Sequence, residues 1–66
     1  MHPAPLPPAD LSAQLAEARA RVAVYRTQAV VDRALGRAAL ATASEHLAAR
    51  WAEVVTQLER LANKPQ

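Results

Sequence analysis

The stretch V30-V-D-R-A-L-G-R-A-A-L40 contains Gly36, the only glycine among the 66 residues of the chain. Its neighbours are good helix formers, and a glycine inside a helix costs only about 1 kcal/mol. Local propensity therefore allows either a turn between two helices or a mild defect in one long helix. Alanine dominates the rest of the chain, and no strand pattern is present. The composition predicts an all-α fold, and the pattern on either side of Gly36 decides its form.

Apolar residues recur at alternating spacings of three and four on both sides of Gly36, which is typical of helices that pack side by side. The first series is Leu11, Leu15, Ala18, Val22, Tyr25, Ala29 and Asp32, and the second is Leu40, Ser44, Leu47, Trp51, Val54, Leu58 and Leu61. The two series are out of phase by one residue. A continuous helix would shift its apolar stripe sideways at this point, whereas a hairpin resets the phase. We predict an antiparallel two-helix hairpin, with one long helix or three helices as alternatives.

The first helix is predicted over residues 10–35. Four of the five prolines lie within residues 3–8, so residues 1–9 are expected to form an extended or disordered leader. Asp10 and Ser12 follow these prolines, and each is a good N-cap residue. The helical hairpin therefore occupies residues 10–63.

The start of the second helix is less closely defined. Residues 42–45, T-A-S-E, match a capping box, in which a hydroxyl and a glutamate each accept a hydrogen bond from a backbone N–H. This motif predicts a turn over about 36–42 and a helix over 43–63, which Asn63 and Pro65 would end. A helix that starts directly after Gly36 remains the alternative.

Side chains of both series are expected to form the core between the helices. The predicted core residues are Leu15, Val22, Tyr25, Leu47, Trp51, Val54, Leu58 and Leu61. Asp32 and Ser44 would meet beside the turn as a polar pair. This core is too small to stabilise some fifty ordered residues, since chains this short usually need disulfides, metals or partners and this one has no cysteine. We therefore expect a homodimeric four-helix bundle or an obligate complex with a helical partner.

Two further stripes are candidates for binding that partner. Val24, Val31 and Leu35 form one stripe on the first helix, and Ala41, Ala48, Val55 and Ala62 form a narrow stripe on the second. Small side chains in the second stripe would let another helix approach closely. The predicted partner-binding residues are Val24, Val31, Leu35, Ala48 and Val55, together with the arginines described next.

Arg19, Arg26 and Arg33 recur every seven residues beside the first apolar series. Such arginines can cover small residues with their apolar stems while their charged ends stay in water. They can also select an acidic partner helix, because charges beside a helical interface influence partner choice. A third possibility is contact with the phosphates of RNA or DNA, although a net charge of +2 does not require it.

No pattern for catalysis, metal binding or cofactor binding is present. His46 has no second histidine or cysteine three or four residues away, the spacing that would let two ligands share a metal ion. The hydroxyl side chains lack a neighbouring histidine base, and there is no glycine-rich phosphate loop. No apolar run approaches the ~20 residues of a membrane span. We expect a non-enzymatic, soluble, cytoplasmic protein without a cofactor, a metal or a small-molecule substrate.

The layout over residues 10–63 resembles two kinds of small helical hairpin. Plasmid copy-control RNA-binding proteins of the Rop type dimerise into four-helix bundles. Type III secretion co-chaperones of the YscE kind form one part of a heteromeric chaperone. The resemblance consists of length, two heptad-bearing helices and a glycine near the bend, so it assigns no functional residue. It implies a protein-interaction module such as an adaptor, co-chaperone or regulatory subunit, with a dimeric nucleic-acid-binding regulator as the alternative.

Overall fold

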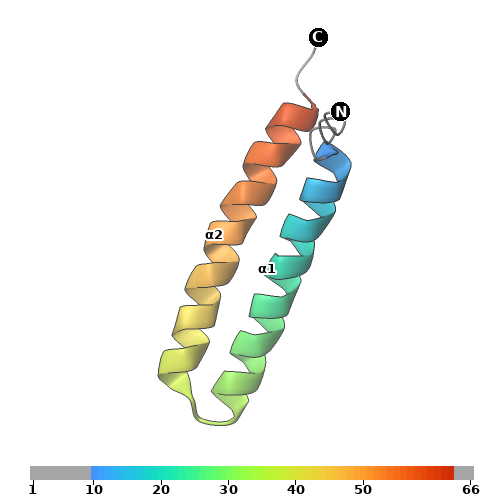
Figure 1. The fold of residues 1–66 in the computed structure, drawn as a ribbon. Helices are drawn as coiled ribbons and strands as arrows, with labels where there is room; N and C mark the ends of the chain where they lie inside the picture. Colours follow the sequence, from blue (N-terminus) through green and yellow to red (C-terminus); the bar gives the residue numbers. More distant parts are fainter. Residues whose placement is uncertain (1–9, 64–66) are drawn as a thin grey trace, which may run out of the picture.

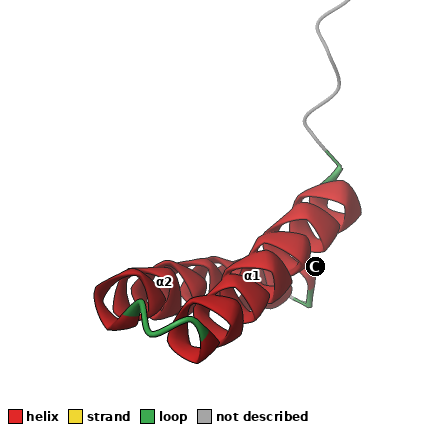
Figure 2. Cartoon of the chain, turned by 90° about the horizontal axis from the view of Figure 1, so that it is seen from below, coloured by secondary structure: helices red, strands yellow, loops and turns green. Residues whose placement is uncertain are grey.

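The computed structural model describes residues 10–63, which form two antiparallel helices joined by a short turn (Figure 1). Helix α1 spans Leu11–Ala34 and helix α2 spans Ala38–Ala62. The view towards the turn shows the two helices side by side in a single layer (Figure 2). The predicted all-α hairpin is confirmed. The leader over residues 1–9 and Pro65 lie outside the described residues.

Helix α1 begins where the sequence provides an N-cap. The carboxylate of Asp10 accepts a hydrogen bond from the backbone N–H of Ser12 at 3.2 Å, and the Asp10 carbonyl accepts the first helical bond, from the N–H of Gln14. This carboxylate satisfies one of the backbone donors that every helix leaves free at its start. Of the two predicted N-cap residues, Asp10 therefore has this role.

Gly36 ends α1 by adopting a backbone conformation that other residues rarely reach. Its φ is +76°, in the left-handed region, and Leu35 is the C-cap. The N–H of Gly36 donates to the carbonyl of Arg33 at 3.1 Å, and the N–H of Arg37 donates to the carbonyl of Asp32 at 2.7 Å. These two bonds are those of the Schellman motif, which satisfies the last carbonyls of a helix. Gly36 is thus the turn residue.

Helix α2 starts directly after this turn, which corrects the prediction of a turn over 36–42 and a helix from 43. Arg37 is its N-cap and accepts the first helical bond, from the N–H of Ala41, without a side-chain cap. Thr42 and Glu45 lie inside the helix, and Glu45 pairs with Arg33 of α1. The capping-box prediction is therefore wrong, because the Schellman turn already reverses the chain within residues 35–37. Asn63 is the C-cap of α2.

The face that α1 turns towards α2 is the predicted one. The buried residues of α1 are Ala18, Val22, Ala29 and Asp32, while Leu11, Leu15 and Tyr25 are half-buried. Asp32 and Ser44 are both buried near the turn. The charged partner of Asp32 there is Arg37, whose guanidinium lies 3.9 Å from the carboxylate.

The inner face of α2 differs from the prediction by one residue. Ala41, Ser44 and Ala48 are buried there, and Trp51, Val54, Val55 and Leu58 are half-buried, so the predicted core position of Val54 is kept in part. Leu47 and Leu61, both predicted in the core, are 38% and 59% exposed. The predicted, leucine-rich series and the alanine-rich series with Ala41, Ala48 and Val55 share Ser44, Trp51 and Leu58. The spacing alone therefore allows either series to face α1. In the structure the alanine series faces α1, because small side chains let two helices approach closely.

Alanines therefore fill most of the space between the helices. Ala41 is 0% and Ala18 is 1% exposed, whereas no large side chain within residues 10–63 is fully buried. A buried alanine contributes much less hydrophobic free energy than a buried leucine, because the free energy scales with the apolar area removed from water. The hairpin thus leaves most of its large apolar side chains in contact with solvent.

Candidate interaction surface

Ion pairs between the helices define one edge of the hairpin. Arg19 of α1 donates to the carboxylate of Glu59 of α2 at 2.9 Å, and Arg33 of α1 pairs with Glu45 of α2. Each of these four residues directly follows an inner residue of its helix, so all four point to the same side. We call this edge, with Arg26 between the two pairs, the arginine face.

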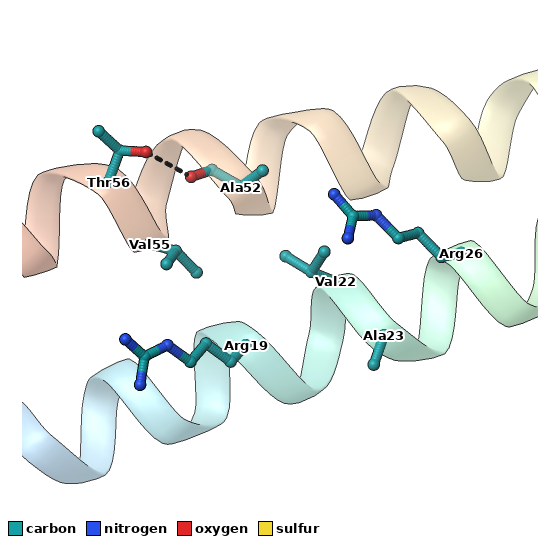
Figure 3. Close-up of a pocket in the computed structure, with 7 residues that line it drawn as sticks. All are labelled: Arg19, Val22, Ala23, Arg26, Ala52, Val55 and Thr56. Carbon is teal, nitrogen blue, oxygen red and sulfur yellow. Dashed lines mark hydrogen bonds between the residues drawn. The ribbon is translucent and has the colours of Figure 1, made fainter.

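Arg26 is the unpaired cation of the arginine face. Arg19 and Arg26 extend from α1 towards α2 on either side of Val22, and Val55 points at Val22 from α2 (Figure 3). Ala52 is the residue of α2 that lies opposite Arg26. Glu45 and Glu59, which pair with Arg33 and Arg19, come seven residues before and after it. Among the described residues, Arg26 therefore has no carboxylate partner, and the shallow groove beside it has one free positive charge.

The opposite edge of the hairpin is apolar along α2, while Arg21 and Gln28 lie at its α1 side. On α2, the residues directly before Ala41, Ala48, Val55 and Ala62 point to this edge, because they lie about 100° around the helix on the side away from Glu45 and Glu59. These residues are Leu40, Leu47, Val54 and Leu61. On α1, Leu35 lies at the same edge, and Val24 and Val31 lie on its outer flank. We call these seven residues the apolar face.

Nearly all the large exposed apolar side chains are on this face. Within residues 10–63, seven such side chains are exposed, and six of them belong to the apolar face: Val24, Val31, Leu35, Leu40, Leu47 and Leu61. Their exposed fractions range from 38% to 60%. The seventh, Val30, lies near Arg26 and Arg33. Several large apolar side chains exposed on one side of a small protein are typical of a protein interaction site.

Aromatic side chains lie at the middle of the apolar face. Tyr25 and Trp51 are both half-buried, and each borders a shallow hollow on the outside of the hairpin. The guanidinium of Arg21 lies 4.8 Å from the centre of the Trp51 ring and also pairs with Glu17 at 3.0 Å. Arg21 thus bridges from α1 to α2 across this edge with its charge already compensated.

The predicted partner-binding residues fall into three groups in the structure. Val24, Val31 and Leu35 are exposed together on the apolar face. Ala48, which is buried, and Val55 instead lie on the inner side of α2, so α1 is the helix that approaches the small-residue stripe. Contact of these two residues with a partner outside the chain stays a prediction.

The arginines and the α2 leucines also differ from expectation. The arginines lie on the far edge from the valines, where two of the three are held by glutamates of the same chain. Leu40, Leu47, Val54 and Leu61 belong to the second apolar series, which was predicted to face the first helix, yet they extend the candidate surface onto α2. Their seven-residue spacing is the signal that marks them as one stripe.

The described residues offer little for other chemistry. His46 is exposed, and no group of three histidine or acidic residues within 10–63 could hold a metal ion. Neither helix in this part of the chain has the length and apolar character needed to cross a membrane. The hollows on the described surface are open and shallow, and one of them lies beside Arg26 and Val30.

Comparison with models of known protein families, with curated proteins and with solved structures gives no match. The function has therefore to be inferred from the surface itself.

Proposed function

We propose that this chain is a non-enzymatic helix-association module. Its apolar face packs against the helices of a protein partner, and this packing completes a four-helix arrangement. Adaptor, co-chaperone and regulatory subunit are the roles that such a module performs, and cytoplasm is the compartment that suits a chain without cysteine.

The observation that carries this proposal is the imbalance between the inside and the outside of the hairpin. The interior holds mostly alanines, with Val22, while six of the seven large apolar side chains that are exposed within residues 10–63 belong to the apolar face. Protein domains are normally built from at least two packed layers around a core, and this hairpin provides one layer. A second layer on the apolar face would bury those side chains and supply the missing stabilisation.

Binding of RNA or DNA through the arginines receives less support. Arg19 and Arg33 are paired with Glu59 and Glu45, so the arginine face has three positive and two negative charges. Phosphate contact would require these ion pairs to open or Arg26 to act alone. A salt-dependent interaction is therefore the signature that separates this alternative from helix association.

The proposal can be tested by affinity capture from the native host with the wild-type chain and two glutamate variants. Leu47→Glu places a charge on the apolar face, and Ala49→Glu places the same charge on an exposed position of the same helix away from that face. We expect the wild-type chain and Ala49→Glu to retain the same partner chains at low and high salt, and Leu47→Glu to lose them. Equal recovery by Leu47→Glu, or loss of all partners with salt or nuclease, would contradict the proposal.

A further inference from the structure

The side of the hairpin that carries the apolar face is large enough for a stable protein interface. Helices of 24 and 25 residues are about 37 Å long, and two of them side by side are about 20 Å wide. One face of the layer therefore covers roughly 700 Å², close to the ~800 Å² that each partner buries in a standard-size complex. An occupant that matches this area is itself about two helices wide and 25 residues long.

The charges around the face allow an identical surface to dock on it. Glu17 and Arg21 compensate each other, and Arg50 and Glu53, which carry opposite charges, both line the shallow hollow beside Leu47 and Val54. A face with charges of one sign would repel its own copy, whereas a nearly neutral apolar face does not. A strongly acidic or basic partner would find no complementary charges here.

The small interior of the hairpin also favours a partner that is present whenever the chain is made. Because alanines form most of the interior, the hairpin depends on its cover for stability and needs that cover as soon as the chain is made. A second copy of the chain is always present at the same concentration. It also supplies a layer of identical length and width, in which the same apolar face is again unpartnered.

We propose that the occupant of the apolar face is a second copy of this chain, bound face to face across a two-fold axis. The inference rests on the proposed function and names its partner. In the resulting four-helix homodimer, the leucines of α2 and the valines of α1 from both copies form the core that the single hairpin lacks. The arginine face of each copy, with the free Arg26, stays on the outside.

Sedimentation equilibrium of the purified chain tests this inference, with no other protein present. We expect a dimer at low micromolar concentration, and a dissociation constant that hardly changes between low and high salt. Leu47→Glu should raise the dissociation constant on the order of 100-fold or more, because a charge would be buried in an apolar interface. Ala49→Glu, on the outer surface, should leave it within about twofold.

A wild-type chain that sediments as a monomer across the micromolar range would overturn the second-copy proposal, whatever the variants do. The proposed function would then still stand if the host capture shows a different protein lost from Leu47→Glu and kept by Ala49→Glu. A dimer that forms equally well in Leu47→Glu would overturn the assignment of the interface to the apolar face.

Discussion

The arginine face and the apolar face are built from the same helices with the same heptad spacing. They differ in whether their side chains find partners within the chain. On the arginine face, Arg19 and Arg33 find Glu59 and Glu45 within the chain. On the apolar face, Leu40, Leu47 and Leu61 have no comparable cover within the hairpin. Folding thus satisfies the charges of the arginine face, whereas it leaves the apolar face uncovered, and association is our proposal for what covers it.

The largest effect is expected from a charge on the apolar face. Leu47→Glu should lower the free energy of unfolding by about 2–4 kcal/mol, because association and folding are coupled in a module whose own core is small. Chemical denaturation followed by circular dichroism at low micromolar concentration measures this change. Ala49→Glu is the control and should change stability by less than about 0.5 kcal/mol. Equal effects of the two variants would remove the distinction between the two faces.

A larger side chain between the helices tests whether the close approach of α1 and α2 is real. Ala41 is fully buried, so Ala41→Leu should overpack the interface and cost about 1–3 kcal/mol. Ala49→Leu, at an exposed position of the same helix away from the apolar face, is the control and should be nearly neutral. Stabilisation by Ala41→Leu would mean that the leucine series, rather than the alanine series, faces α1.

The turn fixes which residues of α2 face α1, and therefore which face remains apolar. Gly36→Ala should cost about 1–2 kcal/mol, because the backbone at this position has φ of +76° and L residues are strained there. No atom lies within 4 Å of the added Cβ, so the cost is conformational rather than steric. Gly36→Asn should cost less than Gly36→Ala, since asparagine tolerates this conformation better. Thermal unfolding of the three chains checks the order, and an alanine variant as stable as the wild type would contradict the turn.

The smallest effects are expected on the arginine face. Arg33 and Glu45 are both more than half exposed, so a double-mutant cycle with Arg33→Ala and Glu45→Ala should give a coupling of about 0–1 kcal/mol that falls as salt is added. Arg26→Ala, which removes no ion pair, should leave stability almost unchanged. A coupling well above this range would show that the arginine face also stabilises the hairpin substantially.

Much of the fold could be predicted from the sequence because its signals are local or strictly periodic. Asp10 caps α1, Gly36 forms the turn, and the inner face of α1 follows the spacing of Ala18, Val22 and Ala29. The inner face of α2 could not be predicted in the same way, because its leucine-rich and alanine-rich series have the same spacing. Side-chain size pointed to the leucines.

The site was predicted in part for the same reason. Val24, Val31 and Leu35 could be recognised as an apolar stripe outside the first apolar series, and all three are exposed. Leu40 and Leu47 were not predicted as partner-binding residues, because the second apolar series was expected to face the first helix. The ion pairs of Arg19 and Arg33 depend on the register across the turn, and that register follows from the Schellman motif rather than from the capping-box residues.

Site-specific photo-cross-linking in the native host tests the central claim most directly, namely that a second layer of helices covers the apolar face. A photoreactive residue would replace Leu47 in one variant and Ala49 in the other, so the two probes lie on the same helix but point to different sides. The account predicts a covalent product from position 47 that is absent from position 49. Products of equal yield from both positions, or no product from position 47, would contradict it.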